Sequence, residues 1–232
     1  MSSKTYPSLS LEQELFNSGF EFVIGIDEVG RGCLFGPVAV GVAVLRASVH
    51  SGKSDWPAKL CDSKLIAEKV REELFESVGS WVSGYAVGMA SAAEIDELGI
   101  TNCLSLAAER AVRELPQQIR GAIAADPTKA KAILDGSHNW LGSALGPVES
   151  MVRTKADRDC VSVAAASVLS KVTRDRLVVE IASIDESLTP YGISGNKGYS
   201  SAGHLAALRE FGPKELHRKT WLHKILAQDE LF

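Results

Sequence analysis

The stretch from Val23 to Pro37, VIGIDEVGRGCLFGP, joins an apolar run to two adjacent acids and then to a Gly-Arg-Gly turn. Residues 20–27 are rich in Phe, Val and Ile and short enough to form a β-strand, and residues 37–45, PVAVGVAVL, predict a second strand. The glycines between these segments permit a sharp turn. Because carboxylates at the end of a buried strand lose hydration unless a positive group neutralises them, we expect Asp27 and Glu28 to face a cation.

The remainder of the chain alternates between helix and strand patterns. Apolar residues at four-residue spacing predict a helix over 63–78, and the capping-box pattern Ser91-x-x-Glu94 predicts the start of another helix. The other elements expected from periodicity are strands over 81–89, 132–134 and 148–154, helices over 102–115 and 160–184, and one or two helices after the Gly/Ser-rich loop that follows Pro190. Long crossovers combined with adjacent strands imply an α/β fold, in which helices flank a mixed sheet.

Length and composition favour a compact chain that works inside the cell. The 232 residues are 45% hydrophobic, which is enough for an ordinary core. The net charge of −4 gives no overall attraction to nucleic acid, so such a partner requires a local basic patch. The four cysteines have neither zinc-site spacing nor a C-x-x-C pair, which is typical of a reduced protein. With no apolar run long enough for a signal peptide or a membrane span, we expect a cytoplasmic monomer without membrane contact.

Two further acids are candidates for the same site as Asp27 and Glu28. Asp135 follows the predicted strand 132–134, and Asp157 lies just before the long helix. Taken alone, Asp135 fits an ordinary Asp-Gly turn and Asp157 fits a helix cap. Acids at the ends of neighbouring strands can nevertheless meet at one edge of a sheet. Oxygen ligands without His or Cys suit Mg²⁺, and four acids are enough for two ions that hydrolyse a phosphodiester.

The chain resembles a known family over most of its length. The hexapeptide at residues 27–32, DEVGRG, is similar to the D-E-A-G-R-G signature of the type 2 ribonucleases H, the bacterial ribonuclease HII family, with Val29 in place of alanine. Five more segments match in the family's order: DSKL from Asp62, LDG from Leu134, KADRDCVSVAAASVLSKVTRD from Lys155, GY at Gly198, and GPKELHRKTW from Gly212. The resemblance extends from about residue 20 to residue 222.

The resemblance implies both a fold and an activity. The fold is ribonuclease H-like, with a mixed five-stranded sheet, flanking helices and a helical C-terminal extension. We accordingly expect an N-terminal extension over 1–19, a catalytic core over 20–190, and a junction-sensing loop with C-terminal helices over 191–232. The family cleaves the RNA strand of RNA–DNA hybrids and nicks duplex DNA on the 5′ side of single embedded ribonucleotides. It uses Mg²⁺ or Mn²⁺, two ions in the catalytic complex, and leaves 3′-OH and 5′-phosphate ends.

The resemblance also assigns residues. Asp27, Glu28, Asp135 and Asp157 correspond to the family's four metal-binding catalytic carboxylates. Asp159 is an alternative to Asp157, but the ten-residue spacing from Asp157 to Ser167 matches the family.

Substrate contacts are expected around the turn and in the loop after Pro190. Without Cβ atoms at Gly30 and Gly32, backbone groups can approach the 2′-hydroxyl that distinguishes RNA from DNA, while Arg31 adds charge for phosphate. Tyr199 corresponds to the tyrosine that senses the RNA-to-DNA junction, although a lone aromatic residue in a loop is often only a lid over the core. Expected phosphate contacts are Lys64, Lys171 and Arg174, although a solvated basic face would show the same pattern.

Other interpretations remain open. A nucleotide-binding module is disfavoured because Gly30-x-Gly32-x-x-x-Gly36 misses the G-x-G-x-x-G pattern by one residue. A non-catalytic nucleic-acid-binding protein would keep binding under chelation and would not cleave. A metal-dependent phosphatase on a similar sheet would act through a nucleophilic aspartate.

Two features lie outside the expected catalytic site. His138 and His217 are interpreted as surface or structural residues, because two-metal hydrolysis needs no histidine base. The final QDELF resembles a sliding-clamp-binding peptide through Gln228, Leu231 and Phe232, but five residues say little, and a frayed apolar end is the favoured interpretation.

Overall fold

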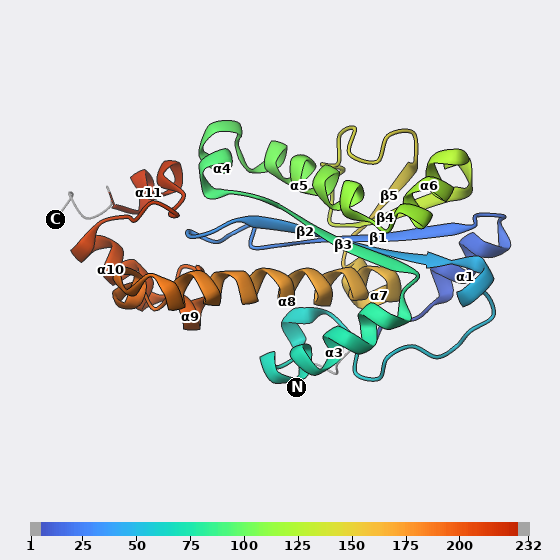
Figure 1. The fold of residues 1–232 in the computed structure, drawn as a ribbon, viewed down its shortest axis with the longest axis horizontal. Helices are drawn as coiled ribbons and strands as arrows, with labels where there is room; N and C mark the ends of the chain where they lie inside the picture. The colour runs from blue at the N-terminus through green and yellow to red at the C-terminus, as the bar shows by residue number, and fades with distance from the viewer. Residues whose placement is uncertain (1–5, 227–232) are drawn as a thin grey trace.

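A mixed five-stranded sheet forms the centre of the protein (Figure 1). The computed structural model describes residues 6–226. The strands are β1 (Phe22–Val29), β2 (Val38–Arg46), β3 (Gly84–Ala90), β4 (Ala130–Asp135) and β5 (Glu149–Arg153), in the spatial order β3-β2-β1-β4-β5. Strand β1 pairs antiparallel with β2 and parallel with β4, while β3 and β5 form the two edges. The predicted mixed five-stranded sheet is therefore confirmed.

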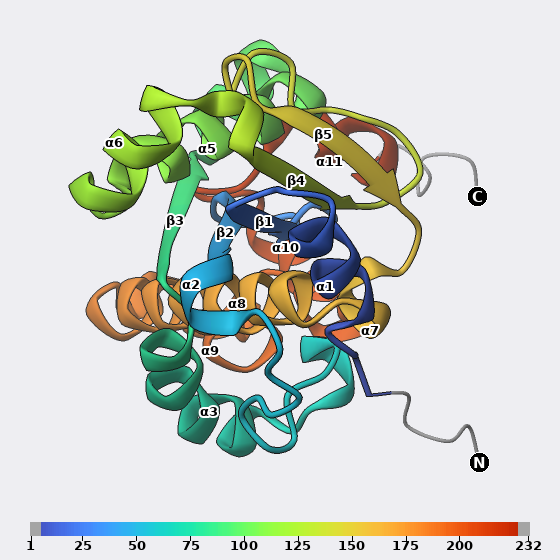
Figure 2. The ribbon, with the colours of Figure 1, turned by 90° about the vertical axis from the view of Figure 1, so that its right-hand side faces the viewer.

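Helices cover both faces of the sheet (Figure 2). On one face lie α5 (Ile100–Glu114) and α6 (Gln117–Ala125), and on the other lies α8 (Val161–Ile184), with α3 (Glu68–Trp81) packed beneath it. The shorter helices are α1 (Ser10–Asn17), α2 (Ala47–His50), α4 (Ala92–Leu98), α7 (Ala156–Asp159), α9 (Ile193–Asn196), α10 (Ala202–Phe211) and α11 (Lys219–Leu226). Short 3₁₀ turns occur at Ser63–Leu65, Pro127–Lys129 and Glu186–Tyr191. No helix within residues 6–226 combines the length and apolar character needed to cross a membrane.

The side-chain alternation of β1 assigns its residues to two separate cores. Ile24 and Ile26 face the core under α5, whereas Val23 faces the core under α8. Asp27 shares the parity of Val23, so its side chain is directed toward α8. Helix α8 can lie against the strand because Gly25 has no Cβ, and a Cβ there would come within 2.2 Å of the Ser162 carbonyl carbon.

The N-terminal segment is integrated into the α8 core. Leu9 directly precedes α1 and Phe16 lies in its last turn, and both side chains join the apolar cluster under α8. The buried Glu12 carboxylate accepts hydrogen bonds at 2.8 Å from both the backbone N–H and the hydroxyl of Ser162, at the first turn of α8. Glu12 thus supplies a hydrogen-bond acceptor to amide groups that a helix start leaves unpaired.

A third apolar cluster lies at the end of the molecule where α10 and α11 pack (Figure 1, left). It joins Leu34 and Phe35, from the loop after β1, to Val178 of α8 and to Leu208 of α10. The loop that carries the Gly-Arg-Gly turn therefore rests on the C-terminal helices.

Two segments differ from the sequence expectations. The helix expected over 63–78 begins only at Glu68, because Ser63–Leu65 form a 3₁₀ turn and Ile66 is extended. The guanidinium of Arg71 holds this turn by donating to the carbonyls of Ser63 and Ile66 at 2.7 and 2.5 Å. Helix α6 was not expected; Pro116 follows the end of α5 and is also the N-cap of this new helix. The predicted capping box at Ser91 and Glu94 is confirmed.

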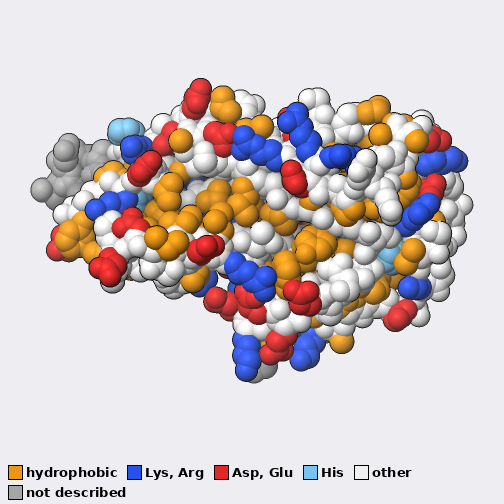
Figure 3. All heavy atoms as spheres, viewed as in Figure 1, with side chains coloured by type: hydrophobic (Ala, Val, Ile, Leu, Met, Phe, Trp, Pro, Cys, Tyr) orange, Lys and Arg blue, Asp and Glu red, His pale blue; other side chains and the backbone are white. Residues whose placement is uncertain are grey.

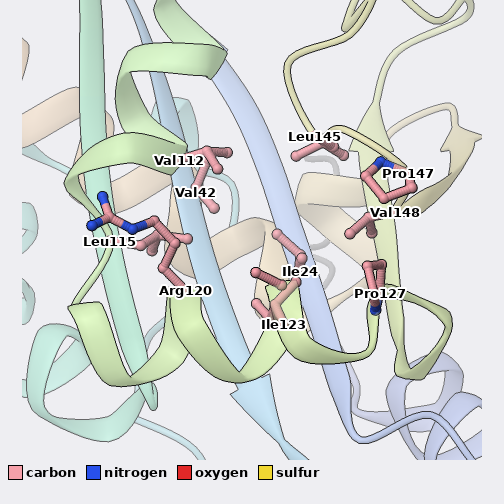
Figure 4. Close-up of a pocket in the computed structure, with 11 residues that line it drawn as sticks. Ile24, Val42, Val112, Leu115, Arg120, Ile123, Pro127, Leu145, Pro147 and Val148 are labelled. Atoms are coloured by element: carbon pink, nitrogen blue, oxygen red, sulfur yellow. The ribbon is translucent and has the colours of Figure 1, made fainter.

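An apolar cavity of about 130 Å³ lies beneath α6 (Figure 4). Its walls come from β1, β2, α5 and the segment before β5, with Ile24, Val112, Ile123 and Leu145 among the lining residues. On the face of the molecule seen in Figure 3, which is that of Figure 1, hydrophobic side chains form a band across the middle, and basic and acidic side chains are interspersed rather than separated. This cavity and the active site described below have no lining residue in common.

Candidate active site

Asp27 and Glu28 lie near the end of β1 and differ in burial. Both pair with β2, opposite Gly41 and Val40, so the acids belong to the strand itself rather than to the loop after it. Asp27 is 3% exposed, and one of its oxygens accepts the Glu28 backbone N–H at 2.8 Å. Burial, together with the neighbouring Glu28 and Asp135, raises the pKa of Asp27 well above its ordinary range, although a hydrogen bond from Ser167 opposes the rise.

Asp135 and Asp157 meet where β4 ends and α7 begins. The Asp135 carboxylate accepts the Ala156 backbone N–H at 2.7 Å, which joins the end of β4 to the turn that carries Asp157. Burial, and then the charges of Asp135 and Asp62, raise the pKa of Asp157 to about 6. Asp159 points elsewhere, since it is exposed and pairs with Arg153 at 2.7 Å. Of these two neighbouring acids, Asp157 is therefore the one that belongs to the cluster.

Lys64 supplies positive charge to this group of acids. Burial by itself would lower the pKa of Lys64, but the nearby carboxylates outweigh burial, and the pKa is raised. The acids responsible are Asp27, Asp62, Asp157 and Asp135. Lys64 lies in the 3₁₀ turn Ser63–Leu65, and the Ser63 hydroxyl receives a hydrogen bond from Ser167 of α8 at 2.9 Å.

Asp62 is a member of the cluster that sequence reasoning missed. Its side chain is 1% exposed, one oxygen accepts the Lys64 backbone N–H at 2.9 Å, and the other lies 3.3 Å from Arg158 Nε. In the sequence Asp62 fits an ordinary cap of the following turn, a role that it also has. Its place in the same DSKL segment as Lys64 was the available signal.

The acid cluster fits hard divalent cations by its chemistry. Its donors are carboxylate oxygens, and the raised pKa values of Asp27 and Asp157 mark negative charge that a cation would stabilise. Across residues 6–226, no three His, Cys, Asp or Glu side chains form a closed set of metal ligands. Mg²⁺ commonly takes one or two carboxylates and keeps several waters, so it does not need such a closed set.

The Gly-Arg-Gly turn is held from inside the protein by two buried arginines. Gly30 has φ +76°, and a Cβ there would lie 2.1 Å from Arg174 Nε, so the turn requires glycine for both reasons. Arg218 is fully buried and donates to the carbonyls of Gly30, Arg31 and Gly36 at 2.7, 2.8 and 3.2 Å. The backbone of the turn is therefore fixed by hydrogen bonds.

Arg174 differs from the sequence expectation of a phosphate contact. Its side chain is 0% exposed and donates to the carbonyls of Pro37, Lys197 and Phe35 at 2.8, 3.0 and 3.2 Å. Lys171 shares its helix face but lies nearer the surface, where it pairs with Asp175. Spacing on the helix predicted the shared face, but it could not predict that the loop 30–37 covers Arg174.

Tyr199 borders the same small cavity as the turn and Lys64. This cavity, of about 170 Å³, is lined by Glu28, Val29, Gly30, Arg31, Gly32, Ser63, Lys64, Lys171 and Tyr199. The ammonium of Lys171 lies 5.1 Å from the centre of the Tyr199 ring, and the residue is 38% exposed. Burial of the hydroxyl raises the pKa of Tyr199 to about 12, so the phenol stays protonated. Most of the residues expected to touch the substrate thus share one cavity beside Glu28.

The fold and the acid cluster together are typical of a metal-dependent phosphodiester hydrolase of the ribonuclease H class. A mixed sheet brings carboxylates from two adjacent strands, β1 and β4, to Asp157 in the turn before a long covering helix. Solved structures share this fold. The ribonuclease H2 of Pyrococcus horikoshii, 24% identical, aligns with a TM-score of 0.62 over 91% of this chain and 100% of its own.

Sequence comparison identifies the family. A family model described as Ribonuclease HII matches residues 24–224. The ribonuclease HII of Streptomyces griseus is 42% identical over 220 residues, 94% of this chain and 84% of its own, and that of Alkaliphilus oremlandii is 36% identical over 95% and 100%. The chain belongs to the ribonuclease HII family. It is an endonuclease that degrades RNA in RNA–DNA hybrids, and the resemblance noted in the sequence is confirmed.

Proposed function

We propose that this enzyme also nicks duplex DNA on the 5′ side of a single embedded ribonucleotide. The observation that carries the proposal is the shared cavity, in which Tyr199 and the Gly-Arg-Gly turn face Glu28 and Lys64. A ribose in this cavity contacts the backbone of the turn through its 2′-hydroxyl, and the next deoxyribose stacks on the exposed Tyr199 ring. Recognition of one ribonucleotide and one following deoxyribonucleotide is what a junction requires.

The four carboxylates of Asp27, Glu28, Asp135 and Asp157 hold two Mg²⁺ or Mn²⁺ ions in this proposal. Ions held by these residues would supply activation of a water and stabilisation of the charge on the leaving oxygen. Hydrolysis adds the water oxygen to phosphorus and breaks the bond to O3′, which takes up a proton. The products are a 3′-OH on the upstream DNA and a 5′-phosphate on the ribonucleotide.

Basic side chains hold the phosphates on either side of the break. Lys64 lies among the acids and lines the cavity, and the Arg31 side chain is 40% exposed with a 3.4 Å contact to Glu28. Lys171, 11% exposed and held by Asp175, adds positive charge next to Tyr199. These contacts position the strand but do not read the base.

The proposal divides the chain by role. Residues 20–190 carry the acids, residues 191–232 carry Tyr199 and the helices behind it, and residues 1–19 precede the core. We infer that the enzyme works as a monomer in the cytoplasm.

A sliding clamp is a proposed partner. A ribonuclease HII from Archaeoglobus fulgidus, 25% identical over 87% of this chain and 94% of its own with a TM-score of 0.62, has been solved as a complex with PCNA. The residues that resemble a clamp-binding peptide here, Gln228, Leu231 and Phe232, lie outside the described residues. Deletion of residues 228–232 should abolish binding to the clamp in a pull-down assay and leave cleavage of a hybrid unchanged.

The test of the nicking activity uses a duplex with one ribonucleotide and, in parallel, a continuous RNA–DNA hybrid. Wild type should nick the first on the 5′ side of the ribonucleotide, and a chelator should stop cleavage of both. Asp27→Asn should lower both rates at least about 100-fold, because a neutral amide cannot replace a bound carboxylate.

The role of Tyr199 is tested separately. Tyr199→Ala should lower the nicking rate more than the hybrid rate, whereas Tyr199→Phe keeps the stacking ring and should stay near wild type. Equal losses on the two substrates for Tyr199→Ala would contradict junction sensing. Absence of nicking by the wild type would contradict the proposed function itself.

A further inference from the structure

Two buried histidines behind the substrate cavity form a hydrogen-bonded pair. His204, in the first turn of α10, and His217, in the segment before α11, are both 0% exposed, and their Nε2 atoms lie 3.0 Å apart. The other nitrogen of His204 lies 2.8 Å from the Tyr199 carbonyl oxygen, and the Lys214 backbone N–H donates to His217 Nδ1 at 2.9 Å. The pair therefore connects the C-terminal segment with the backbone of Tyr199.

The partners at the two ends determine where the protons lie. A backbone N–H can only donate, so His217 Nδ1 accepts and the neutral ring carries its proton on Nε2. That proton is donated to His204 Nε2, which leaves the His204 proton on Nδ1, where it is donated to the Tyr199 carbonyl. The result is a directed chain of three hydrogen bonds between neutral rings. Burial agrees with this arrangement, since it lowers the pKa of both histidines, that of His217 to about 4.

The same short segment also fixes the Gly-Arg-Gly turn. Arg218, next to His217, donates to three carbonyls of the loop 30–36, and its own backbone N–H donates to Leu34 at 2.9 Å. The His217 ring packs edge-on against Phe35, with 5.1 Å between ring centres. Residues 217 and 218 thus hold the turn directly and Tyr199 through His204.

We propose that His204, supported by His217, is a positioning residue that sets Tyr199 relative to the Gly-Arg-Gly turn and so determines how strongly the enzyme prefers a single ribonucleotide over a continuous hybrid. This inference rests on the proposed function, since it assigns Tyr199 the role of junction sensor. The Tyr199 carbonyl receives the His204 hydrogen bond, and the Tyr199 N–H donates to Asn196 at 3.0 Å. Loss of the first bond removes the link between Tyr199 and the His204–His217 pair and leaves the Ser201 N–H as a partner of the carbonyl, while the acid cluster stays intact.

Two polar substitutions at His204 distinguish an effect on the position of Tyr199 from an effect on stability alone. In His204→Asn, the side-chain amide nitrogen occupies the place of Nδ1 and still donates to Tyr199, but His217 Nε2–H loses its acceptor. In His204→Gln, the longer side chain accepts from His217 but does not donate to Tyr199. The Asn variant leaves the buried Nε2–H of His217 unpaired, whereas the Gln variant only removes one of two donors from the Tyr199 carbonyl. Because an unpaired buried donor costs more than an acceptor that keeps another partner, the Asn variant should be the less stable of the two. The Tyr199 carbonyl has that other partner, the Ser201 N–H at 2.9 Å.

The experiment measures thermal unfolding and cleavage of both substrates for wild type and the two variants. His204→Gln should lower the ratio of nicking to hybrid cleavage about 5- to 10-fold, with the hybrid rate within about twofold of wild type. His204→Asn should keep the ratio within about twofold of wild type despite its lower Tm. A ratio that follows Tm, or that is equal in the two variants, would overturn the inference.

A second measurement is independent of nicking. With the Tyr199 ring labelled by ¹³C, its NMR signals should shift in His204→Gln and remain at the wild-type position in His204→Asn. Unchanged signals in both variants would overturn the positioning role, whatever the cleavage data. If wild type fails to nick but the signals behave as expected, the proposed function fails while the positioning of Tyr199 by His204 stands.

Discussion

The acid cluster and the Gly-Arg-Gly turn lie next to each other but differ in whether their polar groups are already satisfied. In the acid cluster, burial and then the neighbouring carboxylates raise the pKa values of Asp27 and Asp157, and Lys64 lies among these acids. At the turn, the buried Arg218 donates hydrogen bonds to the carbonyls of Gly30, Arg31 and Gly36. The first region holds negative charge that a bound cation would compensate, whereas the carbonyls of the second already have their hydrogen-bond donors.

This difference separates chemistry from selectivity. A site that stabilises charge in a reaction gains from holding charge that is not yet compensated, because each bound cation is then strongly favoured. A site that measures the position of a 2′-hydroxyl gains from a backbone that does not move. Substitutions in the two regions should therefore have opposite signatures: lost activity with retained stability in the first, and lost stability in the second.

The largest effect is expected from a matched pair of acids. Asp157→Asn should lower cleavage of a hybrid at least about 100-fold, with no loss in Tm, because the amide removes a buried negative charge from beside Asp135. Asp159→Asn, two residues away, disrupts only the exposed pair with Arg153 and should cleave within about threefold of wild type. Steady-state rates and thermal unfolding give both quantities. Similar rates for the two variants would break the comparison.

Next in size is the loss of a buried arginine. Arg218→Gln leaves buried carbonyls of the turn without donors and should lower the free energy of unfolding by about 3 kcal/mol or more. Arg176→Gln, the control, removes an exposed ion pair with Glu72 and a stacking contact on Phe75, and should change it by at most about 1 kcal/mol. Urea unfolding measures both. A cost for Arg218→Gln as small as that of the control would mean that the turn does not depend on it.

A smaller effect concerns pH and metal. The Asp157 pKa is raised from 3.8 to about 6, so between these values the folded metal-free protein holds a proton that the unfolded chain has released. The stability contributed by this carboxyl therefore falls as pH rises through that window and is constant above it. The difference in Tm between wild type and Asp157→Asn should follow this course in the presence of a chelator.

Added Mg²⁺ should counteract that loss at neutral pH. Saturating Mg²⁺ should raise the wild-type Tm by about 5 °C near pH 7.5, and by much less near pH 4.5, where protonated carboxyls bind it poorly. Asp157→Asn should show a smaller rise at neutral pH. A rise of equal size at both pH values would show that the acids do not bind the ion.

The fold and the acids of the site were largely predictable because local pattern determines them. Strand β1 was placed within two residues of its bounds, and the long helix α8 within one residue of its start. Asp27 and Glu28 were identified because acids at the end of an apolar run conflict with burial. That conflict is visible in sequence without any knowledge of the neighbours.

What could not be predicted is the burial of polar residues by distant segments. Arg174 shows helix spacing that suits a basic surface, and only the fold shows that the loop 30–37 covers it. In the sequence Asp62 fits an ordinary cap, and only the fold shows that Asp157 lies beside it. His204 and His217 are thirteen residues apart with no spacing rule that joins them. Each case depends on contacts between segments, which periodicity does not encode.

The hydrogen bonds from Ser162, in the first turn of α8, to the Glu12 carboxylate have a consequence for the order of folding. The two residues are 150 positions apart in the chain, so this contact closes a very large loop. During synthesis from the N-terminus, α1 leaves the ribosome long before α8, so it lacks this packing partner until most of the polypeptide has been made. Contacts of such long range slow folding, and the apolar face of α1 stays uncovered meanwhile. The nascent enzyme should therefore depend on chaperones most strongly in the interval before residue 162 emerges.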